Sequence, residues 1–366
     1  MFLTVSNIAH FLMERGILDA RSIVGGDFSV AEAGRRCRNF KITRGGLPGL
    51  FVKQIMGHSP EHVATLRREA AFYQLVATRP LLEPLKTISP TYVDFDAGRH
   101  ALVLGLLPQA ENLNELHFRL RRFPVEVGEL LGRGLGAYHA QAANALLEPV
   151  NAQVFPRQPP WIFTLDPATL APLPSFPPHI GRPMMEMLSR RPDLLAHLHA
   201  LGREYEFSAL IHGDMKWDNF IVHPAGPNGE YDFKVIDWEL VDLGDAAWDI
   251  ACILTSYILY VMLIPPQAGT GPAAEDRKDR TLAEAVPSMR RFWQVYVETR
   301  GFGEGAARVF LTRCMRHVGA RLVVAVFEAL FNRSALAAQA ETLMETARAF
   351  LWAPDKAAAD LLGTPS

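Results

Sequence analysis

The chain has 366 residues, of which 49% are hydrophobic and 21% are charged, a composition that excludes disorder and leaves room for two lobes. Its net charge of −2 provides no general basic surface, so neither a nucleic acid nor a membrane is an expected partner. Three widely spaced cysteines form neither a metal-binding pattern nor a disulfide framework, which indicates a reducing, cytoplasmic location.

The first 108 residues combine short strand-like segments with helical ones. Residues 1–18 form an amphipathic helical pattern that has neither the basic region nor the cleavage site of a signal peptide. Residues 59–76 predict a longer helix, with Ser59 as N-cap and Pro60 at its first position. Partly alternating apolar residues predict strands at 28–33, 38–43, 49–54, 91–96 and 101–107. We therefore expect an N-terminal lobe with a small antiparallel sheet and a helix.

Beyond the first lobe the pattern is mainly helical. Helical periodicity covers residues 125–144, 192–205 and 282–350. Residues 153–183 are rich in proline and are expected to be irregular. The apolar run at 250–266 is uncharged for about 15 residues, fewer than the ~20 that a membrane span requires, and therefore predicts a buried core helix. Spaced glycines at 132–139 follow no strand, which excludes a dinucleotide-binding loop.

The densest polar chemistry lies in the segment LIHGDMKWDNF, residues 210–220, at the end of an apolar run. Four residues separate Asp214 from Asn219, and Asp237 ends a second apolar run. The residues between Asn219 and Asp237 predict a strand, a turn and a strand. Such a hairpin brings Asn219 and Asp237 together at its open end. The spacing of Asp214 and Asn219 alone is a weak signal, but the second carboxylate at hairpin distance makes it specific.

Two carboxylates and an amide that converge in this way suit phosphoryl transfer. One carboxylate can orient an acceptor hydroxyl, while the amide and the other carboxylate hold Mg²⁺ that bridges the nucleotide phosphates. A kinase also needs a strand lysine for the phosphates and a helix glutamate to hold that lysine. Lys53 ends the segment LFVK, and Glu69 lies on the next predicted helix. Each is ordinary alone, but their order along the chain together with the loop and the hairpin indicates a kinase.

These segments resemble the aminoglycoside phosphotransferase and choline kinase branch of the protein-kinase-like fold. The distinguishing features are Gly213 in place of the kinase arginine, IDWE in place of Asp-Phe-Gly, and LGDAAWDIA downstream. The resemblance implies an α+β fold with two lobes. Residues 1–108 would form the nucleotide-binding lobe, and residues 109–366 a mainly helical lobe for catalysis and substrate binding. It also implies ATP and Mg²⁺ as cofactors.

The resemblance gives a role to each matching residue. Asp214 would be the catalytic base, or would position the acceptor hydroxyl. Asn219 and Asp237 would be the magnesium ligands. Lys53, paired with Glu69, would position the phosphates.

Three further residues would support the loop. His212 would brace it through backbone hydrogen bonds, and Asp245 would order it. Asp249 opens the apolar helix and would serve as its cap.

The adenine of ATP would lie between the lobes, at the strand LVLGLL and the connector after it. The resemblance implies that backbone groups from Gly105 to Leu107 hydrogen-bond the adenine edge. Val52 and Leu104 would then provide apolar walls.

Two features depart from the family pattern. Lys216 lies two residues after Asp214, as in Ser/Thr protein kinases, where a lysine can stabilise charge on the γ-phosphate during transfer. No Gly-x-Gly-x-x-Gly loop precedes the strands, and EAGRRCRNFKI occupies its place. We expect Gly34 to start that turn and Arg38, with the arginines at 35–36, to lie near phosphates or an anionic substrate.

Three classes of acceptor are open. A polycationic aminoglycoside needs an acidic cleft, whereas choline needs an aromatic cage. Tryptophans flank the site at 217, 238 and 248, although such residues often serve packing. The third class is Ser or Thr of a precursor peptide, because Lys216 and the basic loop resemble kinases of lanthipeptide and thioamide-peptide biosynthesis, whose partner is a separate lyase. The arginines that do not favour a polycation, although they do not exclude one, are Arg290, Arg291, Arg300, Arg308, Arg313, Arg316 and Arg321.

We favour the peptide hydroxyl over antibiotic resistance or choline phosphorylation. Two other functions are less consistent with the sequence. A nucleotide-binding scaffold without activity would lack one of the four central residues, and a metal-dependent phosphohydrolase would not need Lys53 and Glu69. Trp217 and Asp218 have no assigned role.

Overall fold

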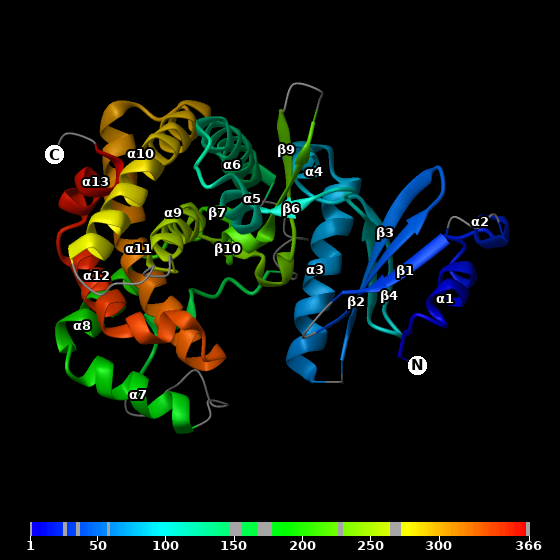
Figure 1. Cartoon of the computed structure of the whole chain (residues 1–366), viewed down its shortest axis with the longest axis horizontal. Coiled ribbons are helices and arrows are strands. Elements are labelled where there is room, and N and C mark those ends of the chain that lie inside the picture. The colour runs from blue at the N-terminus through cyan, green and yellow to red at the C-terminus, as the bar shows by residue number, and fades with distance from the viewer. Residues whose placement is uncertain are drawn as a thin grey trace. The chain divides into compact units, whose positions relative to one another are not determined.

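The structure, a computed structural model, divides into two compact units. The first comprises Met1–Asn112 and Asn219–Val241, and the second comprises Leu113–Asp218 and Asp242–Ser366. Strands are prominent in the first unit and helices in the second (Figure 1), which confirms the expected α+β class. The structure describes residues 2–24, 28–33, 37–56, 59–145, 155–166, 178–225, 230–263 and 272–363.

A five-stranded antiparallel sheet forms the core of the first unit, in the order β1-β2-β3-β5-β4. Its strands are β1 (Phe28–Glu32), β2 (Cys37–Arg44), β3 (Leu47–Ile55), β4 (Tyr92–Asp96) and β5 (Ala101–Gly105). The helices of this unit are α1 (Ile8–Glu14), α2 (Ala20–Val24), α3 (Pro60–Thr78), α4 (Glu83–Ile88) and the 3₁₀ turns η1 (Pro80–Leu82) and η5 (Trp238–Leu240).

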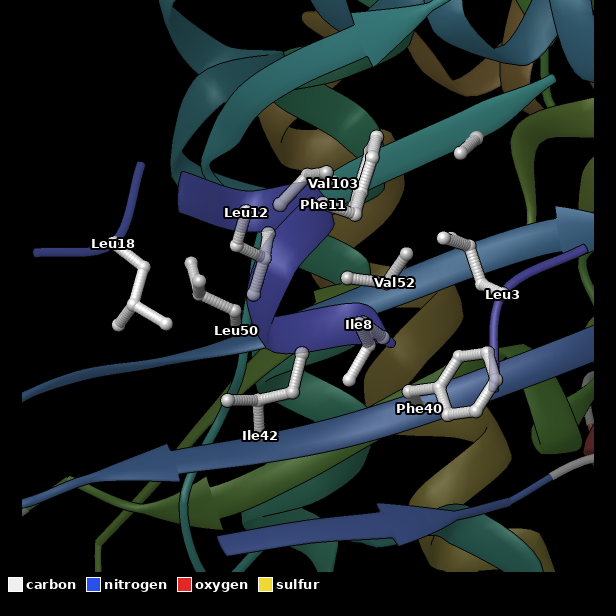
Figure 2. Close-up of a cluster of buried hydrophobic side chains, with 11 residues drawn as sticks. Leu3, Ile8, Phe11, Leu12, Leu18, Phe40, Ile42, Leu50, Val52 and Val103 are labelled. Carbon is white, nitrogen blue, oxygen red and sulfur yellow. The ribbon is translucent and has the colours of Figure 1, made fainter. Parts of the chain in front are cut away.

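The two faces of this sheet differ because successive side chains of a strand point to opposite sides. On one face, Figure 2 shows apolar side chains of α1 against apolar side chains of β2 and β3. The buried strand residues on this face are Phe40, Ile42, Leu50, Val52, Ala101 and Val103. Lys53, which follows Val52, therefore belongs to the opposite face. The amphipathic pattern at the start of the chain forms α1, whose apolar stripe covers the first face.

Helix α3 carries the glutamate expected to hold the strand lysine. It begins at Pro60 after Ser59, although the Ser59 side chain makes no capping hydrogen bond. Glu69, Phe72 and Tyr73 are buried on it. A buried glutamate requires a cationic or hydrogen-bonding partner, and the partner is described below.

A second, three-stranded sheet joins the hairpin to the first unit, in the order β6-β8-β9. Its strands are β6 (Glu111–Asn112), β8 (Phe220–Pro224) and β9 (Tyr231–Val235). The hairpin strands pair with Phe220 opposite Val235. Because β8 also pairs with β6, residues 219–241 belong to the first compact unit, whereas the expected boundary at 108 placed them in the second lobe.

The second unit is built mainly from helices. They are α5 (Leu113–Leu120), α6 (Val125–Ala145), α7 (Pro178–Ser189), α8 (Pro192–Arg203), α9 (Ala246–Leu263), α10 (Pro272–Arg300), α11 (Glu304–Asn332), α12 (Ala340–Trp352), α13 (Pro354–Leu362) and the 3₁₀ turns η3 (Trp161–Phe163) and η6 (Ala335–Gln339). Strands β7 (Ala209–Ile211) and β10 (Asp242–Gly244) pair in this unit, and the 3₁₀ turn η4 (Trp217–Asn219) contains the passage to the first unit.

The glycine-rich segment that resembled a nucleotide loop is the inner face of α6. A Cβ at Gly128, Gly132 or Gly136 would lie 2.3 Å, 2.4 Å or 2.6 Å from atoms of α10. These glycines are four residues apart and share one helix face, so they permit close approach of the two helices. The structure thus confirms that the segment is helical and explains its glycines by packing.

Among the described residues, one helix has the length and composition of a membrane span, α9. Within the structure 78% of it is buried. It packs against α10 and α11. The expectation of a buried core helix is confirmed.

Candidate active site

In the first unit, Lys53 is buried among three carboxylates. Its Nζ lies 2.8 Å from Oε2 of Glu69 and 3.8 Å from Oε2 of Glu239, and it donates a hydrogen bond to Oδ1 of Asp237. Burial lowers the pKa of Lys53, but the three carboxylates raise it to well above its ordinary value. Burial raises the pKa of Glu69 to about 7, and the Lys53 ammonium opposes that shift. Lys53 is therefore a fixed cation on the face of the sheet opposite α1.

The hairpin determines where Asp237 lies. The N–H of Ile236 donates to the carbonyl oxygen of Asn219 at 2.9 Å, so the two ends of the hairpin lie side by side as expected. Asp237 then has φ +66°, a left-handed conformation that is uncommon for non-glycine residues and is found preferentially at functional sites. Trp238 secures the turn by stacking on Phe72 with ring centroids 4.1 Å apart.

A cavity of about 290 Å³ lies beside Lys53, and its whole lining belongs to the first unit. Gly105 and Leu107 line it as expected, together with Leu104. Val52 does not, because it points to the α1 face, and Phe51 forms that wall instead. The other lining residues are Asn39, Lys41, Lys53, Glu69, Tyr73, Pro90, Leu106, Ala110, Ile221, Ile236 and Asp237.

The arginine-rich loop contributes nothing to the described lining of this cavity. Arg38 donates a hydrogen bond to the carbonyl oxygen of Leu3 at 2.7 Å and lies over the ring of Phe2 at 5.6 Å. It is therefore directed to the N-terminal segment, contrary to the expectation that it lies near phosphates. Gly34 and residues 35–36 lie outside the described residues.

Two polar residues of the cavity were missed from sequence, Asn39 and Lys41. Asn39 lies directly opposite Lys53 in the pairing of β2 with β3. Its Oδ1 is buried and has no hydrogen-bond partner among the described residues. The signal that could have identified both is alternation, because Asn39 and Lys41 are two apart on a strand whose other face is apolar.

In the second unit, Asp214 lies on the loop after β7, between two cations. Its Oδ2 is 2.6 Å from Nζ of Lys216, and its Oδ1 is 3.6 Å from Nη2 of Arg321. Burial raises the pKa of Asp214, but the nearby charges of Lys216 and Arg321 lower it by more. The pKa is therefore below its ordinary value. Asp214 is therefore held as a carboxylate.

Asp249, and not Asp245, orders this loop. Its two carboxylate oxygens accept hydrogen bonds from the backbone N–H groups of His212 at 2.8 Å and Gly213 at 3.0 Å. Asp245 instead caps α9, since its Oδ1 accepts from the N–H of Ala247 at 2.9 Å. The sequence-based roles of the two aspartates were therefore exchanged. His212 braces the loop as expected, because its Nδ1 accepts from the N–H of Asp214 at 3.2 Å.

Comparison with known proteins shows the family. A model of the phosphotransferase enzyme family (APH) matches residues 27–270, which is more than half of the chain and includes Lys53, Asp214 and Asp237 but not Arg321. The chain belongs to the phosphotransferase enzyme family.

The fold of this phosphotransferase is similar to that of solved kinases. Choline kinase from Cryptosporidium parvum superposes with a TM-score of 0.59, at 11% identity, over 98% of this chain and 99% of that one. The GDP and kanamycin complex of APH(2")-IIia superposes with a TM-score of 0.52, at 15% identity, over 97% and 99%. Family and fold together confirm the predicted class of enzyme, a kinase with a hydroxyl group as acceptor.

One curated protein also matches in sequence. A stretch of 94 residues is 32% identical to the probable acyl-CoA dehydrogenase IBR3 of Arabidopsis thaliana, over 26% of this chain. The phosphotransferase chain spans about a tenth of the length of that relative.

The tryptophans near the motifs of this phosphotransferase serve packing. Trp217 is buried against His117 and Tyr257, with both ring centroids 4.5 Å away. Trp238 stacks on Phe72, and Trp248 is buried beneath Arg321. None of the three forms part of an exposed aromatic cage within the described structure.

The remaining unassigned residue, Asp218, is a structural contact of the loop. Its Oδ1 accepts a hydrogen bond from Nδ2 of Asn114 at 2.7 Å. The N–H of Trp217 donates to Oγ of Ser256 at 3.3 Å. Both residues therefore attach the loop of the phosphotransferase to neighbouring helices.

Proposed function

We propose that this phosphotransferase transfers the γ-phosphate of ATP to the hydroxyl of a small molecule and requires Mg²⁺. The observation that carries the proposal is the position of Lys53, a buried cation held by Glu69 and Asp237 on the wall of a cavity with apolar and polar sides. A cation fixed in this way can bind nucleotide phosphates without reorganisation. The two described cysteines are buried free thiols, which suits a cytoplasmic enzyme.

The donor side of the proposal uses the first unit. Gly105 and Leu107 would contact the adenine, Lys53 would bind phosphate oxygens, and Asn219 with Asp237 would hold Mg²⁺. The residues fit that ion, since Asp237 has a carboxylate that is 40% exposed and Asn219 is its neighbour across the hairpin end. Mg²⁺ prefers a few protein oxygens together with phosphates. Bound Mg²⁺ would neutralise charge on the phosphates.

The acceptor side of the proposal uses Asp214 in the second unit. As a carboxylate it can accept a hydrogen bond from the acceptor hydroxyl and orient the oxygen for attack. A bond forms between that oxygen and the γ-phosphorus, and the bond from the γ-phosphorus to the oxygen of ADP breaks. The hydroxyl proton passes to Asp214 and then to water. Lys216 can stabilise negative charge on the transferred group.

The acceptor of the proposal is a small molecule, whereas the sequence favoured a peptide hydroxyl because of Lys216. In the structure Lys216 contacts Asp214 directly, and this position would serve any hydroxyl acceptor equally. The solved kinases with a similar fold are named for choline or were solved with kanamycin, and neither of these compounds is a peptide. A Ser or Thr acceptor and a partner lyase consequently have no support beyond the original resemblance.

Binding of Mg²⁺-ATP tests the donor side. We expect Lys53→Ala and Asp237→Ala to lose binding by at least tenfold, the effect of removing one charge-assisted contact. Lys86→Ala is the matched control, because Lys86 is an exposed lysine of the same unit that faces a surface glutamate. Calorimetric titration provides the measurement. Unchanged affinity in both site variants would refute the nucleotide assignment.

A further inference from the structure

Arg321 of α11 is a buried cation with an unpaired Nε–H within the described part of the chain. It is 6% exposed, and its Nε is buried with no partner among the described residues. Its two nearest carboxylates, those of Asp214 and Glu328, lie 3.6 Å and 3.8 Å away, beyond hydrogen-bonding distance. A guanidinium has five N–H donors, and leaving even one of them unsatisfied in a buried place is costly. Such an arrangement needs a functional explanation.

The surroundings of Arg321 hold it in place without satisfying it. The ring of Trp248 lies 5.6 Å from the guanidinium carbon and supports it from one side. Glu328 is 45% exposed, and an ion pair with an exposed carboxylate contributes little. Asp214 is already bonded to Lys216 through Oδ2. Lys216 and Arg321 therefore share Asp214 as their shielded carboxylate, and Glu328 adds only a partly exposed one, so a further negative group would be attracted.

We propose that Arg321 binds an oxyanion carried by the acceptor itself, so that the acceptor is an alcohol with a carboxylate or phosphate group. This inference rests on the proposed function, because it takes Asp214 as the residue that orients the hydroxyl. The planar guanidinium fork matches either oxyanion through two parallel hydrogen bonds.

Distances limit how far apart the hydroxyl and the anion are. Arg321 Nη2 and Asp214 Oδ1 are 3.6 Å apart. With hydrogen bonds of about 2.8 Å at each, the acceptor hydroxyl oxygen and the oxyanion are at most about 9 Å apart. The acceptor is therefore a compact hydroxy acid or phosphorylated alcohol, or it presents such a unit at one end.

The same geometry disfavours the cationic acceptors. Choline or a polyamine next to Lys216 and Arg321 would meet two like charges, which repel in a partly buried site. The tryptophans that could have formed a cation-binding cage are packed in the interior. Arg291 of α10 and Arg313 of α11 do not create this effect, because Arg291 pairs with Glu129 and Arg313 with Glu206.

Matched substrate pairs test the proposal on the unmodified enzyme. Phosphate transfer from Mg²⁺-ATP would be measured with 3-hydroxybutyrate and its methyl ester, with 6-hydroxyhexanoate and its methyl ester, and with glycerol 3-phosphate and glycerol. Choline and kanamycin complete the set. We expect kcat/KM for the anionic member to exceed that for its neutral partner by on the order of 30-fold. The carboxylate and phosphate pairs distinguish the two sources of the anion.

Variants then assign the preference to Arg321. Arg321→Met should abolish the preference for the anionic substrate, and Arg321→Lys should retain part of it. In both variants the KM of the acceptor should change and the KM of ATP should not. Arg316→Met is the control, since Arg316 lies on the same helix and pairs with exposed Glu204. Equal transfer to acid and ester, a preference for choline or kanamycin, or a preference that survives in Arg321→Met would overturn the proposal.

A binding measurement covers the case in which no compound of the set accepts phosphate. Propionate or inorganic phosphate should raise the unfolding temperature of the wild type and not of Arg321→Met. Absence of any such shift would overturn the inference. Failure of the proposed function has a different result: the wild type would not bind Mg²⁺-ATP. If the wild type binds Mg²⁺-ATP but transfers phosphate to a cationic acceptor, only the inference about Arg321 is refuted.

Discussion

At the residue scale, the most constrained backbone position is Gly213, which precedes Asp214 and has φ +82°. Only glycine adopts this conformation without strain, since other L-residues lose roughly 1–2 kcal/mol in the left-handed region. This is the physical reason for glycine where protein kinases have arginine. In the same loop the backbone N–H groups of His212 and Gly213 donate hydrogen bonds to the carboxylate of Asp249.

Gly213→Ala should lower the free energy of unfolding by about 1–2 kcal/mol and lower kcat by on the order of 100-fold, because a shift of about 1 Å at Asp214 misplaces the hydroxyl. Gly301→Ala is the matched control, since Gly301 has φ +67° with open space around its Cα. It should lose similar stability and keep its kcat. Denaturant unfolding and steady-state kinetics supply the two readouts, and equal kcat losses in both variants would contradict the prediction.

The charge on Asp214 leads to a pH prediction. Burial raises its pKa, whereas Lys216 and Arg321 lower it to below the ordinary value. A carboxylate that must be ionised gives activity above its pKa, which is lost as the pH falls through that value. Lys216→Met removes a lowering contribution, so the acid limb of kcat/KM should move to higher pH, while Lys216→Arg should leave it in place. A profile of kcat/KM from about pH 4 to pH 8 tests this prediction. An acid limb that does not move in Lys216→Met would show that Lys216 does not lower the pKa of Asp214.

The two aspartates at the start of α9 also predict different losses. Asp249→Asn leaves one loop N–H without an acceptor and should reduce kcat as well as stability, by about 1–3 kcal/mol for the latter. Asp245→Asn weakens a helix cap and a contact with His317, and should reduce stability while kcat is retained. Kinetics and thermal unfolding of both variants test this assignment. The opposite pattern would restore the roles expected from sequence.

Residue identity was easier to predict from sequence than residue role. The pair of Lys53 and Glu69 was predicted, because the lysine ends an apolar strand and the glutamate lies on the next helix. Asp245 and Asp249 could not be separated, since both lie at the start of the same helix and only the path of the loop decides which one faces its N–H groups. Arg321 was one of nine arginines in the helical region 282–350, and its burial depends on contacts with distant Trp248 and Asp214.

At the element scale, helix packing explains glycines that local propensity would disfavour. Glycine in a helix interior costs about 1 kcal/mol relative to alanine, and α6 has three of them against α10. The helical pattern and the absence of a preceding strand showed from sequence that the segment is not a nucleotide loop. The partner helix could not be named, because it follows more than 120 residues later in the chain.

Gly132→Ala should therefore destabilise the protein despite its better helix propensity. The new Cβ would lie 2.4 Å from the carbonyl oxygen of Phe292, so α6 and α10 must separate, at a cost of about 1–3 kcal/mol. Gly305→Ala is the control, because Gly305 lies in the first turn of α11 with nothing within 4 Å. Its unfolding temperature should stay the same or rise. A rise in Gly132→Ala as well would contradict the packing argument.

At the scale of the whole molecule, the order of elements made the fold predictable. A strand-rich segment followed by a mainly helical one, with the polar loop and hairpin inside the helical part, matches the family even at low sequence identity. The assignment of residues 219–241 was not predictable, because it depends on β8 pairing with the two-residue strand β6. So short a strand has no periodicity to detect.

The division into two compact units leads to the last prediction. All described lining residues of the cavity proposed for the nucleotide belong to the first unit, and a ligand raises the opening free energy of the structure that binds it. With a non-hydrolysable ATP analogue and Mg²⁺ at about 100 times Kd, amide exchange in β3, β5 and the β8–β9 hairpin should slow by up to about 100-fold. Amides of α10 and α11 should be unchanged, because each unit has its own core.

Lys53→Ala should abolish the slowing of exchange, which would show that the slowing comes from the proposed nucleotide site. Equal slowing in α11 would mean that the units open as one.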